Sequence, residues 1–173
     1  MGRGEGEGAM KYLADCMLGK LAKELRMLGY DTIYYRGEDA HQMIQLARQE
    51  GRVILTRNTK LIPKRPEDHI IRVMEDNPLL QLKELIQKGH ISLNAENLFS
   101  RCLLCNVLID EIPRGEAEGK VPDFFFYQQK EFYRCPQCGR IYWQGSHQGN
   151  MQKRMEELFK RKHNIKCQSS KSK

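Results

Sequence analysis

At 173 residues, the chain can form one medium-sized domain with a small appended module, or one larger domain. Hydrophobic residues make up 40% of it and charged residues 29%, which favours a folded core beneath a charged surface. No apolar run approaches the ~18 residues of a membrane-spanning helix, so we expect no membrane span. The first nine residues are rich in Gly and charge and lack an apolar centre. We therefore expect a disordered extension there and no signal peptide.

The net charge of +7 is concentrated at the C-terminal end. Residues 150–173 contain eight Lys or Arg residues and two Glu residues. A basic tail of this kind suits a polyanionic partner such as RNA, because binding releases counterions from the phosphates. A solvated terminal segment that aids solubility explains the same charge equally well. The sequence identifies no protein partner.

Strands and amphipathic helices alternate over residues 10–90. The predicted strands cover residues 11–15, 31–35, 53–55 and 69–74, and the predicted helices lie within residues 16–30, 38–51 and 77–89. In the first helix, leucines 18, 21, 25 and 28 fall on one face, and Lys20, Lys23 and Arg26 fall on the other. The alternation predicts a parallel sheet with helices on its faces, an α/β fold.

Local signals define the ends of two helices. Glu38 or Asp39 is expected to cap the second helix, which Gly51 closes. Asn77 and Pro78 are typical of a helix start and are expected to begin the third helix. The link at residues 59–64 is poorly defined, and a helical turn would fit it.

A second, smaller module begins after residue 96. Short β-like runs at residues 107–112, 123–128 and 140–143 surround four cysteines, and residues 151–161 are helical in pattern. We therefore divide the chain into an extension (1–9), an α/β domain (10–90), a cysteine module (97–149) and a basic C-terminal helix and tail (150–173).

Two Cys-x-x-Cys pairs carry the strongest chemical signal. Cys102 with Cys105 and Cys135 with Cys138 can place four thiolates around one zinc ion, and a site closed in this way is structural. Disulfides or unconnected buried thiols are the alternative. No secretory signal is visible, so we expect a reducing compartment, the cytoplasm, which favours zinc. Of the two remaining cysteines, Cys16 is expected to be a small buried residue, and Cys167 lies in the tail without context.

Each predicted strand is followed by polar or acidic residues. They are Asp15 after the first strand, Glu38 and Asp39 after the second, Asn58 after the third and Asp76 after the fourth. The carboxyl ends of parallel strands meet at one edge of a sheet, so these side chains could converge and hold Mg²⁺ or Mn²⁺. The alternative is that strand ends and helix caps simply favour Asp and Asn.

Other motifs carry less information. The sequence lacks both the glycine-rich dinucleotide motif and the P-loop motif, which argues against nucleotide-cofactor chemistry. The histidines at 41, 69, 90, 147 and 163 show no metal-ligand spacing. The aromatic run at residues 124–127, with Tyr133, Tyr142 and Trp143, could stack on bases. A small aromatic core is the favoured interpretation.

Four stretches together resemble the Mut-seven C-terminal RNase domain family. They are LADCMLGKLAKELRMLGYDT, GRVILTRNTKL, FSRCLLCN and EFYRCPQCGRIYWQGSH, and the resemblance runs from about Lys11 to about Met151. It implies a PIN-like, Rossmann-like three-layer α/β/α fold that is followed by a zinc ribbon. It also implies acidic residues that hold Mg²⁺ or Mn²⁺ for the hydrolysis of RNA.

Carried over by position, the resemblance makes Asp15, the pair Glu38 and Asp39, and Asp76 the acidic site. It makes the four cysteines the zinc ligands. The chain departs from the family pattern at Asn58, where the pattern has Asp. Because an amide oxygen can still bind a cation, we expect weaker metal binding, tuned toward Mn²⁺, and not an inactive site.

We assign Lys20, Lys23 and Arg57 to substrate binding. Arg57 could contact a phosphate, and an ion pair with a nearby acid is equally compatible with its position. The first hypothesis is a metal-dependent ribonuclease that cuts RNA internally. The second is a non-catalytic RNA-binding or ribonucleoprotein adaptor that keeps the fold and has lost the chemistry.

Overall fold

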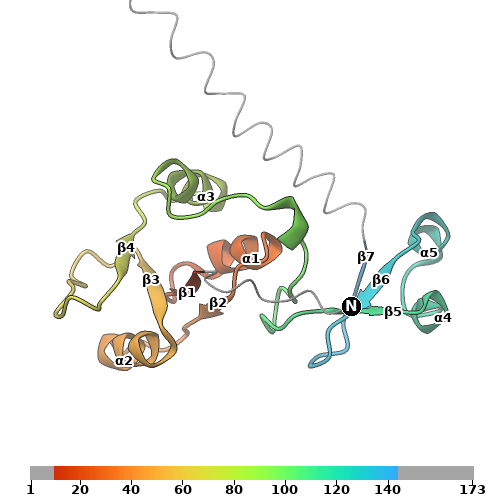
Figure 1. Ribbon diagram of the computed structural model, residues 1–173, viewed down its shortest axis with the longest axis horizontal. Coiled ribbons are helices and arrows are strands. Elements are labelled where there is room, and N and C mark those ends of the chain that lie inside the picture. The colour runs from red at the N-terminus through yellow and green to blue at the C-terminus, as the bar shows by residue number, and fades with distance from the viewer. Residues whose placement is uncertain (1–9, 144–173) are drawn as a thin grey trace, which may run out of the picture. The chain divides into compact units, whose positions relative to one another are not determined.

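A computed structural model of the chain describes residues 10–143 (Figure 1). The described residues form two compact units. The first contains the residues up to Ile109 together with Cys135–Gly139, and the second contains Asp110–Arg134 and the residues from Arg140 onward. Both cysteine pairs therefore belong to the first unit. The expected extension (1–9), the C-terminal helix and tail (150–173), and Cys167 lie outside the described residues.

A parallel sheet of four strands in the order β2-β1-β3-β4 forms the centre of the first unit. The strands are β1 (Lys11–Ala14), β2 (Thr32–Tyr34), β3 (Arg52–Thr56) and β4 (Ile70–Arg72). In the register of the sheet, Leu13 lies opposite both Ile33 and Ile54. The central strands β1 and β3 are almost wholly buried, as expected for a sheet that is covered on both faces.

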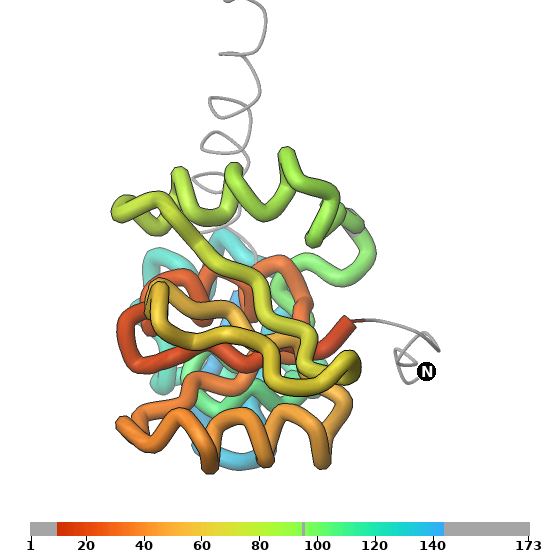
Figure 2. The backbone as a smooth tube through the Cα atoms, turned by 90° about the vertical axis from the view of Figure 1, so that its left-hand side faces the viewer, coloured from red at the N-terminus to blue at the C-terminus, as the bar shows by residue number. Residues whose placement is uncertain are grey.

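Three helices cover this sheet. They are α1 (Gly19–Met27), α2 (Ala40–Glu50) and α3 (Pro78–Gln87). Helix α2 packs Met43, Ile44 and Ala47 against one face of the sheet. Helices α1 and α3 contact each other on the opposite side, as Figures 1 and 2 show. This three-layer α/β/α arrangement confirms the predicted fold class.

The helix ends follow the predicted signals. The Oδ1 atom of Asp39 accepts hydrogen bonds from the amides of His41 (2.7 Å) and Gln42 (3.2 Å), so Asp39 is the capping residue. Gly51 closes α2 in the left-handed conformation. Asn77 caps α3 through the amide of Leu79. Residues 59–64 form a turn without a helix.

The second unit is a small antiparallel sheet with two short helices. Its strands are β5 (Asp110–Ile112), β6 (Phe132–Arg134) and β7 (Ile141–Trp143), paired in that order. Its helices are α4 (Arg114–Ala117) and α5 (Asp123–Gln128), and a 3₁₀ turn (Ala95–Asn97) belongs to the first unit. The buried cluster of this second unit is Ile112, Ala117, Val121 and Phe132.

The β-like prediction for residues 123–128 is wrong, because this segment is helix α5. Pro122 directly precedes the helix, and its carbonyl accepts hydrogen bonds from the amides of Phe125 and Phe126. The ring of Phe126 stacks on Phe132 with 5.8 Å between centroids, as a core interpretation requires. Tyr127, by contrast, is 77% exposed.

No helix within residues 10–143 is both long enough and apolar enough to span a membrane.

Gly29 follows α1 at a point where the chain permits no side chain. Its φ angle is +89°, and a Cβ atom there would lie 2.2 Å from the carbonyl oxygen of Asn97. Gly51 also has a positive φ angle, +61°, but nothing lies within 4 Å of the corresponding Cβ position. A side chain at Gly51 would therefore meet only the cost of the left-handed backbone conformation, whereas one at Gly29 would also collide with Asn97.

We expect Gly29→Ala to lower the free energy of unfolding clearly more than Gly51→Ala. The left-handed conformation alone costs a non-glycine residue about 1–2 kcal/mol. The backbone overlap at position 29 should add about 1–3 kcal/mol. Urea unfolding of the two variants measures the difference, and equal losses would show that Asn97 does not restrict position 29.

Candidate functional site

Asp15 is the buried carboxylate at the edge where the parallel strands end. It follows β1 directly and is 6% exposed. Its Oδ1 atom accepts a hydrogen bond from the amide of Met17 (2.9 Å). Its Oδ2 atom accepts hydrogen bonds from the hydroxyl of Thr56 and the amide of Arg57. Asp15 therefore ties the end of β1 to the end of β3, and its position is fixed by backbone on both sides.

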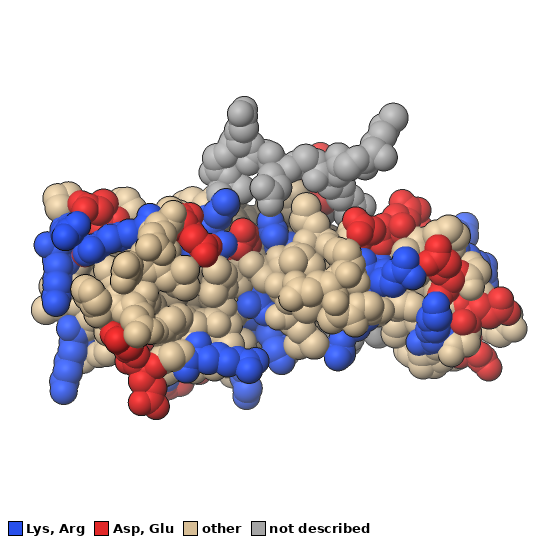
Figure 3. All heavy atoms as spheres, turned by 90° about the horizontal axis from the view of Figure 1, so that it is seen from below, with Lys and Arg blue, Asp and Glu red and all other residues tan. Residues whose placement is uncertain are grey.

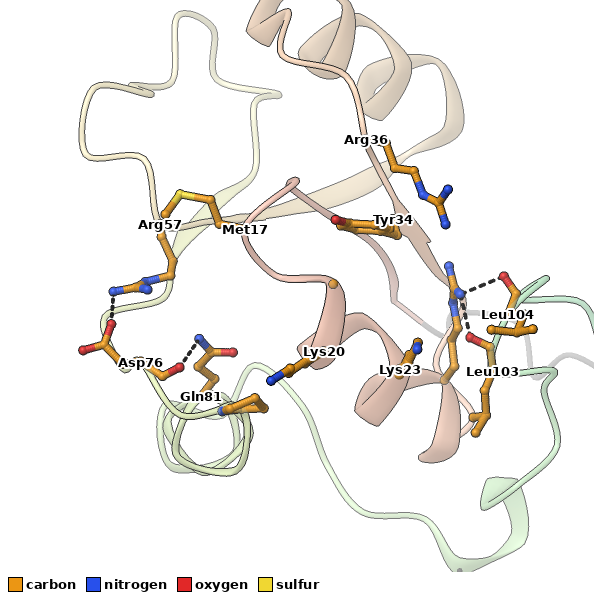
Figure 4. Close-up of a pocket in the computed structure, with 13 residues that line it drawn as sticks. Met17, Lys20, Lys23, Tyr34, Arg36, Arg57, Asp76, Gln81, Leu103 and Leu104 are labelled. Carbon is orange, nitrogen blue, oxygen red and sulfur yellow. Dashed lines mark hydrogen bonds and ion pairs between the residues drawn. The ribbon is translucent and has the colours of Figure 1, made fainter.

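Arg57 connects this carboxylate to Asp76. Its amide donates to Asp15, and its guanidinium forms an ion pair with the carboxylate of Asp76, as Figure 4 shows. The side chain of Asp76 is 87% exposed and that of Arg57 is 29% exposed. Gln81 of α3 donates from Nε2 to the carbonyl of Asp76 (3.3 Å). Two of the predicted acidic positions are thus linked through one arginine, and the ion pair expected as one interpretation of Arg57 is present.

Asn58 is exposed and lies beside this chain of contacts. The backbone amide of Asn58 donates to Thr56 Oγ1 (2.9 Å), and its side-chain Oδ1 atom accepts from the backbone amide of Lys60 (2.9 Å). The side chain therefore closes a turn after β3. A carboxylate at this position could accept the same hydrogen bond, so the turn does not require the amide.

Glu38 and Asp39 lie exposed before α2, where Asp39 serves as the helix cap. Within residues 10–143, no three Asp, Glu or His side chains bring their ligand atoms within 4.8 Å of one another. The acids therefore do not form a cage of three protein carboxylates. One or two carboxylates can hold Mg²⁺ only when other ligands, such as water and phosphate, complete its coordination.

A pocket of about 510 Å³ opens next to Asp15. Met17 and Arg57, which both donate to Asp15, line it. Its charged lining residues are the cations Lys20, Lys23, Arg26, Arg36 and Arg57 and the carboxylate of Asp76. Figure 4 shows Lys20 and Lys23 extending from α1 between the Arg57 side and the side of Leu103 and Leu104. The predicted substrate-binding residues thus share one pocket.

This excess of positive charge is a local property. On the face drawn in Figure 3, Lys and Arg side chains are interspersed with Asp and Glu. In the pocket lining, cations outnumber carboxylates five to one. A pocket with this balance attracts anions.

Tyr34 and Arg36 are pocket residues that the sequence reasoning missed. The guanidinium of Arg36 lies over the Tyr34 ring, 5.6 Å from its centroid. The hydroxyl of Tyr34 donates to the carbonyl of Cys16 (2.9 Å), which fixes the ring beside the start of α1. Cys16 itself is exposed, so its predicted burial is wrong. The sequence did offer one signal for Arg36 as a site residue, because it lies just beyond the second strand, at the edge where the other predicted site residues lie.

The four predicted zinc ligands form a compact cluster. The Sγ atoms of Cys102, Cys105, Cys135 and Cys138 all lie within 4.8 Å of one another. The separation of 3.8 Å between the Sγ atoms of Cys102 and Cys138 equals the edge of a tetrahedron with Zn–S bonds of about 2.3 Å. These four are free thiols and form no disulfide. The cluster can therefore bind a metal ion such as zinc.

Each cysteine pair adopts the same local turn. The amide of Cys105 donates to the Sγ of Cys102 (3.3 Å), and the amide of Cys138 donates to the Sγ of Cys135 (3.4 Å). Burial raises the pKa of Cys105 to about 12, with hydrogen bonding among the thiols adding to the effect. Four thiolates at such a site need a cation to offset their charge.

Asn106 attaches the first cysteine pair to the sheet. It has a positive φ angle of 67°. Its Oδ1 atom accepts from the amide of Thr32 (2.9 Å), and its Nδ2 atom donates to Asp31 (2.7 Å). Burial raises the pKa of Asp31, but hydrogen bonds from Arg52 and Asn106 outweigh this effect and leave the pKa lowered. The ionised Asp31 carboxylate thus holds both the sheet edge and the cysteine segment.

We expect the purified chain to contain one zinc ion and Cys135→Ser to lose it, because a closed site needs all four sulfur ligands. The melting temperature should fall with the metal, since metal binding contributes to folding. Cys16→Ser is the matched control, because Cys16 lies outside the cluster. Metal analysis of both variants checks this, and full zinc occupancy in Cys135→Ser would contradict it.

Comparison with known proteins identifies the family of the chain. The family model described as the Mut7-C RNAse domain matches residues 10–155. The human protein named exonuclease mut-7 homolog is 33% identical over 103 residues, which cover 57% of this chain and 12% of that protein. No solved structure matches the chain significantly. The family match covers most of the chain and includes the strand ends, the basic pocket and all four cysteines. The chain belongs to the Mut7-C RNase domain family.

Proposed function

We propose that this chain is a metal-dependent ribonuclease that cleaves phosphodiester bonds within RNA. The observation that carries the proposal is the buried Asp15 carboxylate beside a pocket with five cations. A fixed anion next to an anion-binding pocket suits the hydrolysis of a charged ester, which needs both phosphate binding and water activation. The family match supports RNA as the substrate.

The cations of the pocket bind and orient the RNA. Lys20 and Lys23, on neighbouring turns of α1, attract consecutive phosphates of a strand that crosses the helix. Arg57 offers a planar guanidinium to the pocket, and its backbone amide donates to Asp15. A phosphate that binds Arg57 would compete with Asp76 for this guanidinium. Substrate binding would then release the Asp76 carboxylate.

The acidic residues provide the anions of the site. Asp15 is the principal ligand and Asp39 the second, with Glu38, Asn58 and Asp76 in supporting positions. A bound Mg²⁺ or Mn²⁺ would activate water and stabilise negative charge on the phosphate. Asp15 keeps its carboxylate in place through Met17, Thr56 and Arg57, so little reorganisation is needed when the substrate arrives. We propose zinc as the metal of the cysteine cluster, in a structural role.

A second candidate is an RNA-binding adaptor without catalytic activity. The lack of a cluster of three carboxylates among the described residues and the ion pair of Asp76 with Arg57 favour it. Binding of RNA is common to both candidates. Dependence of cleavage on a divalent ion and on Asp15 belongs to the ribonuclease alone.

We expect Asp15→Asn to lower the rate of RNA cleavage about 100-fold or more, because removal of one fixed charge group from an active site costs about this much. Linear and circular RNA are incubated with Mg²⁺, with Mn²⁺ and with chelator. A circular RNA has no end, so its cleavage identifies internal cutting. The control is Asp110→Asn, which removes an exposed carboxylate from the second unit.

Unchanged melting temperature and RNA affinity would show that Asp15→Asn remains folded. Cleavage by this folded variant at the wild-type rate would contradict the proposed role of Asp15. RNA binding by the wild type without cleavage under any of the metal conditions would favour the adaptor.

We expect the double variant Lys20→Ala/Lys23→Ala to bind RNA more weakly and with a shallower salt dependence. Each lost phosphate contact on a single strand should reduce the slope of log K against log salt by about 0.7. Fluorescence anisotropy over a salt series measures this slope. Lys11→Ala/Lys64→Ala removes the same charge from exposed positions outside the pocket. Equal slopes in the two double variants would exclude Lys20 and Lys23 from the RNA site.

A further inference from the structure

Arg26 is a buried cation that joins three parts of the first unit. It belongs to α1 and is 7% exposed. Its Nε atom donates to the carbonyl of Thr32 at the start of β2 (2.8 Å). Its Nη1 atom donates to the carbonyls of Leu103 (2.8 Å) and Leu104 (3.0 Å). These two residues lie between Cys102 and Cys105, in the segment that we call the first knuckle (residues 102–105).

The charge of Arg26 is suited to this position. Its guanidinium places a positive charge directly beside the segment that contains Cys102 and Cys105. A zinc ion with four thiolates carries a net charge of about −2, so a cation beside the knuckle is favourable. A metal ion bound by the cysteines would therefore stabilise, through sulfur, the same backbone that Arg26 holds through the carbonyls of Leu103 and Leu104.

The first knuckle also reaches the basic pocket. Leu103 and Leu104 line it together with Lys23 and Arg36. Figure 4 shows the two leucines on the opposite side of the pocket from Arg57 and Asp76. Leu104 is 48% exposed, although it is a large apolar residue. The pocket thus combines cations along its length with an apolar surface at the knuckle end.

We propose that the first knuckle is a wall of the RNA site, that Leu104 contacts a base of single-stranded RNA, and that Arg26 holds this wall in place. The metal bound by the cysteines then determines RNA affinity as well as stability. This inference rests on the proposed function, since it takes RNA as the ligand of the pocket.

A single strand suits the pocket better than a duplex. An apolar side chain can contact a base face only where that base is unstacked and accessible, which double-stranded RNA does not offer. The volume of about 510 Å³ lies within the range of about 300–1,000 Å³ typical of pockets for small organic ligands. Such a space accommodates a unit of the size of a nucleotide and excludes a helix.

The test compares Leu104→Glu with Leu93→Glu. Leu93 is 42% exposed, close to Leu104 in exposure, and lies in the same unit outside the pocket lining. Both variants add one negative charge and remove one exposed leucine. We expect Leu104→Glu to weaken the binding of single-stranded RNA about tenfold and Leu93→Glu to change it less than about twofold. Leu104→Met should bind RNA as tightly as the wild type, because methionine keeps the apolar surface.

The role of Arg26 and the metal needs a readout that does not depend on RNA. Amide hydrogen exchange is followed in the full chain with zinc and after zinc removal, at Thr32 and at Asn106. The Thr32 amide donates to the Asn106 side chain, and the Asn106 amide donates to the carbonyl of Cys102 (2.9 Å), so release of the knuckle should raise exchange at both amides. Arg26→Lys should raise the same exchange while zinc content is retained, because lysine cannot reproduce the planar contacts of arginine.

The two experiments test separate parts of the proposal. Equal loss of RNA affinity in Leu104→Glu and Leu93→Glu, with both variants folded, would overturn the RNA-contacting wall. Unchanged exchange at Thr32 after zinc removal would overturn the link between metal and pocket. A wild-type chain that binds no RNA would instead overturn the proposed function, and the exchange data would still report whether the metal centre supports the pocket wall.

Discussion

The burial of one arginine side chain constrains the arrangement of the first unit. A buried guanidinium must have its donors paired, and Arg26 pairs them with carbonyls of β2 and of the first knuckle. The cysteine segment is therefore held against α1 and the sheet. Asn106 adds a second attachment to the sheet through Thr32 and Asp31. These contacts hold the first cysteine pair in the unit that contains the parallel sheet, and the second pair approaches the first in the sulfur cluster.

The balance of charge at the sheet edge determines what kind of site it can be. Repulsion among several close carboxylates would demand a bound cation, but within residues 10–143 no three carboxylates lie that close together, and Asp76 is paired with Arg57. The pocket beside them has an excess of cations and so attracts the phosphate first. In the proposed mechanism the substrate would contribute part of the metal site, which is a usual way for proteins to bind Mg²⁺ at phosphates. In the proposed mechanism, Asn58 in place of an acid would matter less than the position of Asp15.

Local signals in the sequence were sufficient to predict the helices and strands of the α/β fold. Helical periodicity and caps such as Asp39, Gly51 and Asn77 act within a few residues, so the sequence displays them directly. Residues 123–128 were assigned the wrong structure because an unbroken aromatic run has no period, and the hydrogen bonds to Pro122 depend on geometry. Arg26 was placed on the polar face of its helix. Its burial depends on a segment almost 80 residues away, which periodicity cannot reveal. Arg36 was missed for the same reason, since pocket membership is a tertiary property.

The central claim is that Asp15 and the basic pocket act together on RNA through a divalent ion. A structure of the chain with Mn²⁺ and a short phosphorothioate RNA, which resists cleavage, tests this most directly. The account predicts an anomalous scattering peak for Mn²⁺ at the Asp15 carboxylate, shared with an RNA phosphate, and a guanidinium of Arg57 turned from Asp76 to the RNA. RNA bound in the pocket with no Mn²⁺ at Asp15 would contradict the account and identify the chain as an RNA-binding protein without this chemistry.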